Sequence, residues 1–461
     1  MKTGNDLGRD SVPSLVLKLA IPTMVAQFVN VLYSIIDRMY IGHIPEYGDL
    51  ALAGAGICGP IVTLLSSFGT LVGLGGSIQM SIRMGERNMK KARQILSNSL
   101  LLLTLFSAVL TVLFLMIKGQ LLRWFGASDQ TFAYANTYLT IYTIGTFFAL
   151  MAVGLNYFIN CQGFPVIGMT TVLIGTVCNI ILDPVFIFGL RMGISGAAAA
   201  TVISQCVSFC ILFFQCNFRK GCIRLRPGKF TPSLKIYGEI LHAGLPSLCR
   251  QGLASAAAVA LNVAANPFGD AAIAAMSIVT RYMMFINSAL IGFGQGFQPV
   301  CGFNFGAKRY DRVLEAFWFC LKVAVILLTT LGVISFFGAE AIMGLFRKGD
   351  LEVIGIGTWA MRFQCLTLPF QAWIIMSNML TQSIGYGFRA SIVAAGRQGI
   401  FLIPALLTLP RFLGILGLQL CQPIADVCTS VMAAVIVVSI LKELKVWNEE
   451  IQNLSKKTMD E

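Results

Sequence analysis

Residues 166–190 read "VIGMTTVLIGTVCNIILDPVFIFGL", an apolar run whose only charged side chain is Asp183. The run is long enough to cross the hydrocarbon core of a bilayer as a helix, which takes about 20 residues. A carboxylate near the centre of such a helix costs about 2.5–3.5 kcal/mol on insertion scales, so it is a candidate functional group by default. The stretch therefore predicts a membrane span with a candidate site inside it.

Similar apolar runs recur along nearly the whole chain. Of its 461 residues 56% are hydrophobic and only 12% are charged, and its mean hydropathy is +0.77. Soluble domains carry about 25% charged residues. We therefore predict an all-α integral membrane protein with twelve transmembrane helices. The expected spans are 14–41, 50–78, 94–117, 132–160, 166–190, 195–217, 237–264, 271–302, 313–338, 353–384, 389–410 and 415–441.

The basic residues between these spans are unevenly distributed. About 23 Lys and Arg residues fall on the side of the two termini and about 6 on the other side. Basic loops stay in the cytoplasm, so both termini are predicted to be cytoplasmic. The net charge of +13 reflects this bias and attraction to anionic lipid. A nucleic-acid surface is not expected, because the basic residues are spread over several loops and both tails.

The two halves of the chain resemble each other. "FGDAAIAAMSI" (268–278) repeats "YGDLALAGAGI" (47–57), and the same register places Gly73 and Gly75 against Gly294 and Gly296. Two six-helix lobes related by an internal repeat are therefore predicted, with a cavity between them. The expected divisions are a first lobe with the ion-coupling site (1–218), a cytoplasmic basic linker (219–235), a second lobe (236–441) and a cytoplasmic tail (442–461).

Asp183 has neighbours that fit a polar site. Asn179 lies one turn earlier on the same helix face. Pro184 cannot donate to the carbonyl of Ile180, so that oxygen is free and the helix is expected to kink. The alternative interpretation of Asp183 is a purely structural hydrogen bond.

A second acid, Asp37, lies in the first span. Two carboxylates together with amide and hydroxyl oxygens suit a proton or a sodium ion. Further oxygen donors for such a site are expected from Asn30, Asn156 and Thr201. The alternative for Asp37 is an ion pair with the adjacent Arg38. Aligning the repeats puts Leu409 where Asp183 lies and Leu261 near the position of Asp37, so ion coupling is expected in the first lobe alone.

Other chemistry finds little support. The sequence contains no GxxxxGK[ST] phosphate loop and no CxxC pair. With only two histidines, its thirteen cysteines predict no zinc site. We therefore expect no enzyme activity, no cofactor and no metal apart from sodium, and active transport would have to use an ion gradient.

Several motifs carry a resemblance to a known family. These are "LAIPTMVAQFVNVLYSIIDRMYIG" (19–42), "NIILDPVFI" (179–187) and the GxGxGxQPxxGxNxGAxxxxR pattern of Gly292 to Arg312. The chain resembles the multidrug and toxic compound extrusion (MATE) family, in its DinF-like branch and of the MepA type. The resemblance implies the MATE fold, a bacterial plasma membrane, and drug export against protons or sodium ions. It also implies that Asp37, Asn179, Asp183 and Thr201 form the ion site. The second-lobe acids of the NorM-like branch have no counterpart in spans seven, eight or ten.

Soft and aromatic side chains are the candidates for binding substrate. Met and aromatic residues repack around varied ligands and face organic cations. The expected cavity residues are Phe147, Met151, Arg281 and Met284. The alternative is that the apolar ones face lipid or pack in the bundle. Arg281 needs a partner, and either an ion pair with Asp426 or a role at the cytoplasmic gate would supply one.

The function predicted on these grounds is secondary active efflux of amphipathic, often cationic, drugs or toxic metabolites by alternating access, with protons or sodium ions exchanged. We expect a monomer whose other contacts are membrane lipids. Two alternatives stay open: a flippase for a lipid-linked precursor of the same superfamily, and a non-transporting membrane receptor.

Overall fold

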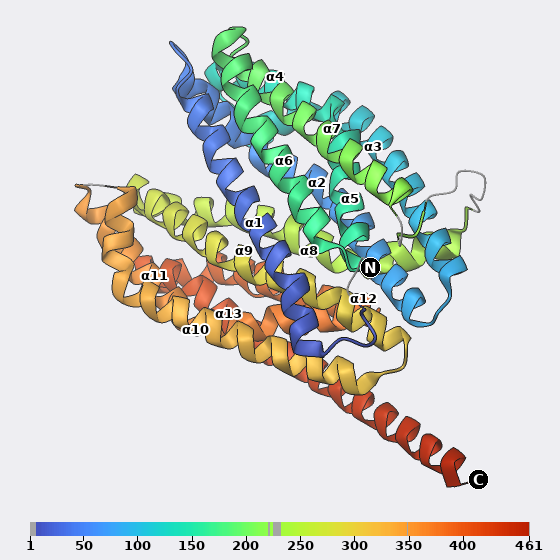
Figure 1. Ribbon diagram of the computed structural model, residues 1–461. Helices are drawn as coiled ribbons and strands as arrows, with labels where there is room; N and C mark the ends of the chain where they lie inside the picture. Colours follow the sequence, from blue (N-terminus) through green and yellow to red (C-terminus); the bar gives the residue numbers. More distant parts are fainter. Residues whose placement is uncertain (1–5, 220–221, 225–231, 348, 461) are drawn as a thin grey trace.

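The computed structural model describes residues 6–219, 222–224, 232–347 and 349–460, with side chains up to residue 454. Much of the predicted linker 219–235 lies outside the described residues. The described chain is helical and contains no strand, which confirms the predicted all-α class (Figure 1).

The first lobe comprises eight helical elements. They are α1 (Val12–Gly42), α2 (Gly48–Gly85), α3 (Met89–Trp124), α4 (Asp129–Ile144), α5 (Thr146–Cys161), α6 (Pro165–Pro184), the π-helix η1 (Val185–Gly189) and α7 (Ile194–Phe218). The second lobe comprises α8 (Leu234–Ala265), the 3-10 turn η3 (Asn266–Phe268), α9 (Asp270–Gly306), α10 (Tyr310–Phe346), α11 (Leu351–Ser383), α12 (Gly387–Ala395), the π-helix η4 (Gly396–Ile400) and α13 (Leu402–Asp460).

Each of the twelve predicted spans coincides with a helix or a broken helix. Nine described helices are long and apolar enough to cross a membrane, or ten when α4 and α5, bent by 56°, count as one. An eleventh span is α11, which is less apolar than the others. A twelfth appears when the stretch from Gly387 to Leu454 is counted as two helices, because the non-helical Gly414 divides it. Most observed helices extend beyond the predicted ends by at most about eight residues, and α13 continues to Asp460, well past the predicted end at 441.

Breaks in the helices fall at positions that sequence chemistry explains. Pro184 ends α6 because proline has no N–H to continue the ladder, and the wider turn of η1 follows it. Gly193 before α7 has φ 57° and ψ −133°, and Gly414 has nearly the same pair, φ 60° and ψ −139°. Only glycine adopts this backbone readily. The two glycines therefore make the same turn in the two lobes.

The lobes meet through glycines that repeat between them. A Cβ on Gly85 of α2 would collide with the carbonyl of Phe303, and a Cβ on Gly306 of α9 would collide with the carbonyl of Ile82. Gly306 lies 221 residues after Gly85, and Phe303 lies 221 residues after Ile82. The contact is thus reciprocal, as expected where two similar halves pack about a common axis.

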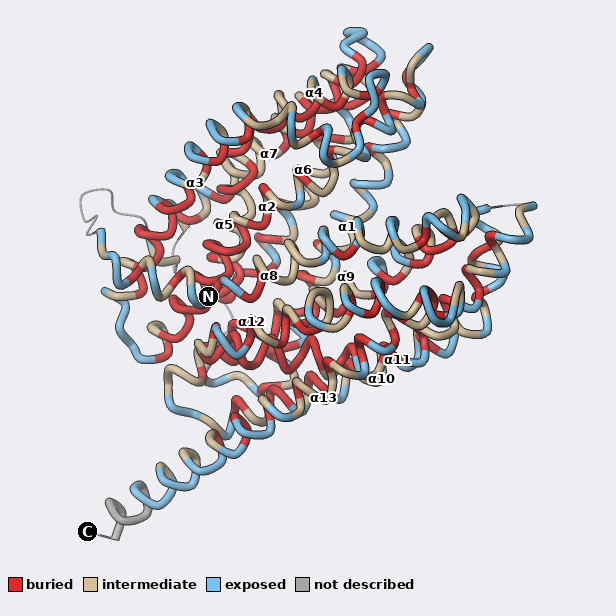
Figure 2. The backbone as a smooth tube through the Cα atoms, turned by 180° about the vertical axis from the view of Figure 1, so that it is seen from behind, coloured by how far each residue is buried: buried red, intermediate tan, exposed pale blue. Residues whose placement is uncertain are grey.

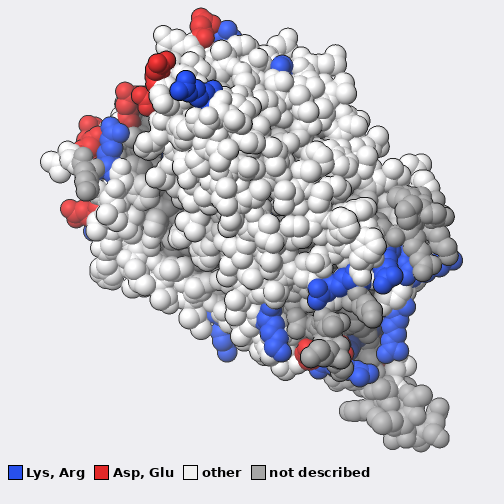
Figure 3. All heavy atoms as spheres, turned by 45° about the horizontal axis from the view of Figure 1, so that its top comes forward, with Lys and Arg blue, Asp and Glu red and all other residues white. Residues whose placement is uncertain are grey.

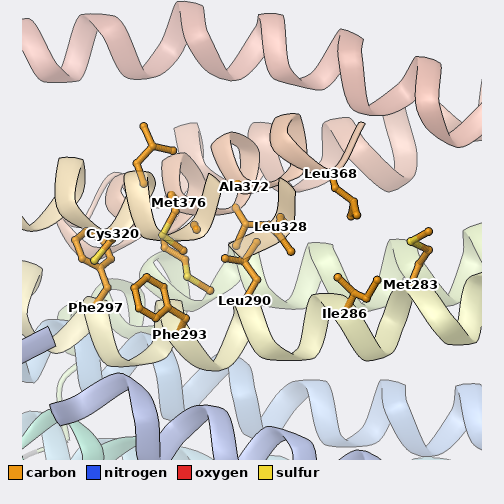
Figure 4. Packing of buried hydrophobic residues seen from close by; sticks show 14 of the residues in the cluster. Met283, Ile286, Leu290, Phe293, Phe297, Cys320, Leu328, Leu368, Ala372 and Met376 are labelled. Atoms are coloured by element: carbon orange, nitrogen blue, oxygen red, sulfur yellow. The ribbon is translucent and has the colours of Figure 1, made fainter. Parts of the chain in front are cut away.

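Each lobe has its own hydrophobic core, and the cores do not follow the chain strictly. Leu15 and Leu19 at the start of α1 pack in the core of the second lobe. Ile236 and Ile240 at the start of α8 pack in the core of the first lobe. Figure 2 shows buried segments along both bundles. Figure 4 shows the second-lobe core, where α9, α10 and α11 contribute Phe293, Phe297, Cys320, Leu328, Ala372 and Met376.

The lobes lie closest together at the end of the molecule where α13 projects, and they diverge toward the opposite end (Figure 1). An ion pair between Arg83 of α2 and Glu239 of α8, at 3.4 Å, joins them at the closed end. In Figure 3 charged residues gather at two edges, and a broad band of uncharged residues lies between them. This pattern is typical of a membrane protein whose apolar belt faces lipid.

Candidate functional site

Two helices bring the predicted acids into one site. Asp37 comes from the last turns of α1, and Asp183 from the end of α6, along which α1 packs. Asp183 is completely buried and Asp37 is 8% exposed. The two carboxyl groups lie within electrostatic reach of each other. The structure therefore brings together the two acids that the sequence singles out.

Asn179 and Thr201 connect this acid site to α7. The Asn179 amide, oriented by its partners, donates to Oδ2 of Asp183 at 2.9 Å and accepts from the backbone N–H of Thr201 at 3.2 Å. The Thr201 hydroxyl donates to the Ala197 carbonyl at 3.0 Å. It lies 3.2 Å from the hydroxyl of Tyr33, which is then the donor in that pair. All four residues of the predicted ion site are thus connected or adjacent.

Neither acid has a full set of partners. Oδ1 of Asp37 and Oδ1 of Asp183 are both buried without a hydrogen-bond partner. Within the described part of the chain, neither acid forms an ion pair, so the predicted alternative of an Asp37–Arg38 pair is not observed. Buried polar atoms are nearly always paired in proteins, so two orphaned carboxylate oxygens call for a ligand. A proton or a small hard cation has the right chemistry for them.

A cavity of about 270 Å³ with both polar and apolar side chains in its wall opens inside the first lobe and reaches this site at Tyr33. Its walls come from α1, α2, α5, α6 and α7, with Gln295 of α9 reaching in from the second lobe. Asn30 and Asn156 line it, as does Tyr33. The other polar residues of the wall are Thr23, Gln27, Ser66, Tyr157, Asn160, Thr171, Thr176, Ser204, Gln205 and Ser208. The cavity wall therefore combines amides, hydroxyls and two tyrosine rings with apolar side chains such as Met169, Val172 and Leu212.

A chain of amides crosses from one lobe to the other along this wall. Gln27 of α1 donates to the side-chain oxygen of Gln295 at 3.1 Å. Gln295 in turn donates to the Tyr157 hydroxyl of α5 at 3.3 Å. The second lobe therefore contacts the cavity through one residue of α9, inside the GxGxGxQP motif.

Asn156 has a structural partner as well as a place in the cavity wall. Its amide donates to the carbonyl of Gly168 at 3.1 Å and ties α5 to α6. Asn378 of the second lobe makes the same bond to the carbonyl of Ala390, at 2.6 Å. The bond is thus common to both lobes and is not specific to the acid site.

The residues expected to bind substrate lie elsewhere. Met151 is 4% exposed in the first-lobe core, and Phe147 packs against the rings of Phe148 and Phe209. Met284 is 64% exposed on α9. None of these, nor Arg281, lines the cavity described above. The packing alternative fits Phe147 and Met151, because apolar side chains at helical spacing fill cores by default.

Arg281 does not pair with Asp426. It lies near Arg38, whose positive charge acts on it. Asp426 instead forms an ion pair with Arg397, from Nε to Oδ1 at 2.8 Å, and both lie inside the second lobe. Arg397 lies in η4, which follows α12 inside the predicted span 389–410.

Sequence analysis also missed the tyrosines around the acids. Tyr33, Tyr138 and Tyr142 all lie within electrostatic reach of one another, and Tyr33 and Tyr138 also of Asp37. Tyr33 precedes Asp37 by four residues, a spacing that places both side chains on one helix face. That spacing was the available signal. Tyr138 and Tyr142 lie on α4 and give no such signal, because only the fold brings α4 to α1.

Both halves of the chain are similar to one protein family. The family model MatE matches residues 22–185 and again residues 246–407, so one model fits each half of the chain. Multidrug export protein MepA of Staphylococcus saprophyticus is 26% identical over 439 residues, covering 94% of this chain and 95% of that protein. MepA of Staphylococcus aureus strain NCTC 8325 is 24% identical, covering 93% of both chains.

Solved structures share the fold. A MATE protein crystallised in complex with MaL6 superimposes with a TM-score of 0.89 at 22% identity, covering 96% of this chain and all of that chain. A MOP superfamily transporter from Pyrococcus furiosus superimposes with a TM-score of 0.90 at 22% identity, covering 96% and 99%. The twelve-helix architecture is thus that of known membrane transporters.

Proposed function

Because this chain belongs to the MatE family, a family of transporters and not of enzymes, we propose that it exports amphipathic, often cationic, organic compounds in exchange for protons or sodium ions. One observation carries the proposal: two buried acids with orphaned oxygens lie next to a cavity in the first lobe whose wall is part polar and part apolar. The printed function of the MepA relatives, multidrug export, supports the class of substrate.

The acids supply the coupling. With Asp37 and Asp183 ionised, the site attracts a cation and the adjacent cavity favours a positively charged compound. A proton or sodium ion entering from outside occupies the orphaned oxygens and removes that attraction. Transport requires ion and substrate to favour different states of the protein. Asn179 and Thr201 complete the oxygen set, and Tyr33 fixes the hydroxyl of Thr201.

Alternating access follows from the shape of the molecule. The lobes are joined at the closed end by Arg83 and Glu239 and by the reciprocal glycine contacts, and they diverge at the other end. The positive-inside rule places the closed end in the cytoplasm with both termini, so this state faces outward. Ion binding would rearrange α1 and α6 around Pro22 and Pro184, where each helix lacks a backbone hydrogen bond.

The setting we propose is the bacterial plasma membrane, with a monomer surrounded by lipid and small-molecule drugs or toxic metabolites as partners. No cofactor and no nucleic acid enters this proposal. A lipid-precursor flippase is the second candidate, and it is disfavoured because none of the described residues that line the cavity carries a positive charge, which an anionic headgroup needs. A receptor without transport would not need paired acids.

The test is drug efflux from a pump-deficient bacterial host, comparing the natural chain with Asp183→Asn. A pH gradient and a sodium gradient are imposed separately on cells or proteoliposomes. We expect gradient-driven efflux to fall to the level of the empty host in Asp183→Asn at equal expression, and the effective gradient identifies the ion. Unchanged efflux in the variant would assign Asp183 a structural role and refute ion coupling at this site.

A further inference from the structure

The two lobes can be matched residue by residue through contacts that repeat. Gly193 and Gly414 make the same turn before α7 and before the last part of α13. Asn156 and Asn378 make the same bond to the next helix. A Cβ on Gly175 of α6 would meet Ser208, and a Cβ on Gly396 of η4 would meet Met432 first and then Thr429, which lies 221 residues after Ser208. These pairs fix the equivalent positions around the first-lobe cavity.

Three residues of the cavity wall have charged or larger polar counterparts in the second lobe. Gln371 lies seven residues before Asn378, as Ala149 lies seven before Asn156. Arg397 follows Gly396 as Thr176 follows Gly175, and Asp426 lies twelve residues after Gly414 as Gln205 lies twelve after Gly193. Where the first lobe has space between Ala149, Thr176 and Gln205, the second lobe has a polar cluster.

Asp426 is fully satisfied within this cluster. It is completely buried, and Oδ1 accepts from Arg397 Nε at 2.8 Å and from Gln422 at 3.0 Å. Oδ2 accepts from Gln371 at 2.7 Å and from Thr367 at 3.3 Å. Four donors leave no capacity for a coupling ion. Asp426 therefore orients Arg397 by accepting a hydrogen bond from Nε of its guanidinium.

Arg397 is not satisfied to the same degree. Of its five N–H groups only Nε–H has an acceptor among the described residues, and the side chain is 17% exposed. The two terminal nitrogens therefore point into accessible space. An arginine at membrane depth needs an anionic partner or a water-filled path. Its η4 segment packs on α8, with Gly399 against Leu253, on the side of the lobe that α8 shares with the first lobe.

We propose that Arg397, oriented by Asp426, is an anion-binding residue of the second lobe that takes the carboxylate of a transported amphipathic compound. A guanidinium fixed at Nε presents its terminal N–H groups as a fork, which matches a carboxylate in two parallel bonds. Such a compound would place a cationic group toward the acids of the first lobe and its carboxylate on Arg397. The proposal rests on the proposed export function and specifies its substrates.

A matched pair of dyes tests it. Rhodamine 110 has a free carboxylate, and rhodamine 123 is its methyl ester with the same cationic ring system. Fluorescence anisotropy with the purified full chain in detergent gives an affinity for each dye, and the readout is their ratio. We expect the natural chain to prefer rhodamine 110 and Arg397→Gln to lower the preference about tenfold, as a lost charge-assisted hydrogen bond would. Arg397→Lys should retain part of it.

Two controls separate this proposal from the export proposal and from misfolding. Arg389→Gln removes an arginine of α12 whose ion pair with Glu443 is 45% and 33% exposed, and should leave the ratio unchanged. Asp426→Asn should lower the ratio in the same direction, because Arg397 loses its orientation. Binding of rhodamine 123 that is lost in Asp183→Asn reports on the export site separately.

Three results would overturn the assignment. One is a ratio that Arg397→Gln does not change in a monodisperse preparation, and another is a natural chain that binds the ester but not the acid. The third is competition by phosphatidylglycerol without any preference for the carboxylate dye, since this would assign the guanidinium to a lipid phosphate.

Discussion

Asp183 in the first lobe and Asp426 in the second are both completely buried acids in a membrane helix bundle, yet their surroundings are opposite. Asp183 accepts one hydrogen bond, from Asn179, and has one oxygen without a partner. Asp426 accepts four, one of them from an arginine. Burial alone therefore does not identify a functional acid. The number of donors around it separates a site that awaits a ligand from one that is structurally complete.

The largest effect on stability is expected from breaking the complete site. Asp426→Leu leaves the Arg397 guanidinium inside the bundle without its counter-charge, and removing one partner of a buried pair costs about 3–5 kcal/mol. The apparent melting temperature of the purified protein in detergent should fall by many degrees. Arg397→Met combined with Asp426→Leu removes both charges and should recover most of the loss. A single variant as stable as the natural chain would contradict the assignment of Asp426 as structural.

A smaller loss of stability, similar in the two lobes, is expected when the asparagine-to-carbonyl hydrogen bond that each lobe contains is removed. Asn156→Leu and Asn378→Leu each remove a side-chain donor from the carbonyl of Gly168 or Ala390, which keeps the backbone bond of its own helix, and losing such a hydrogen bond costs about 0.5–1.5 kcal/mol. Thermal unfolding should show similar losses for the two variants. A loss confined to one lobe would show that the two bonds do not have equivalent roles, and would weaken the residue matching on which the comparison of the lobes depends.

Much of this fold follows from the sequence because one rule dominates it. In lipid every backbone group must be bonded within the helix, so apolar length alone predicts the spans. Asp183 and Asp37 stand out in the sequence for the same reason, because a charged residue in such a run needs a function or a partner, and their role with Asn179 and Thr201 as an ion site stays a prediction. The cavity wall could not be predicted, because Gln27, Gln205 and Gln295 come from three helices whose neighbours only the packing determines.

The same limit explains the errors about arginine. The sequence suggested Arg281 as a partner for Asp426, but the partner is Arg397 of the π-helix η4, and this pairing is a tertiary feature. Phe147 and Met151 were expected at the cavity because ring and sulfur side chains suit drug binding. Such side chains also pack cores, and helical periodicity does not distinguish the two roles.

Tyr33 gives a finer test of the incomplete site. Its hydroxyl lies 3.2 Å from Thr201 and holds that side chain beside Asn179. Tyr33→Phe removes one hydrogen bond and keeps the ring in place, so the free energy of unfolding should fall by about 1 kcal/mol. Gradient-driven efflux should fall several-fold while expression stays normal, because the oxygen set for the ion is no longer fixed. Tyr282→Phe is the matched control, since Tyr282 bonds Ser335 at 2.6 Å in the second lobe. Efflux in that control should remain near the natural level.

Asp183→Asn is expected to have the smallest effect on stability although it should abolish transport. Asp183→Asn replaces an acid whose buried oxygen has no donor by a neutral amide of the same size, so the cost of burying a charge disappears. The melting temperature should stay within the error of the measurement or rise slightly, and efflux should be lost. The opposite is expected for Asp426→Leu, which should lose stability because it leaves the positive charge of Arg397 unpaired inside the bundle. If Asp183→Asn instead unfolded the protein, its carboxylate would have to be bound by donors that the first lobe does not provide, and the distinction between the two acids would fail.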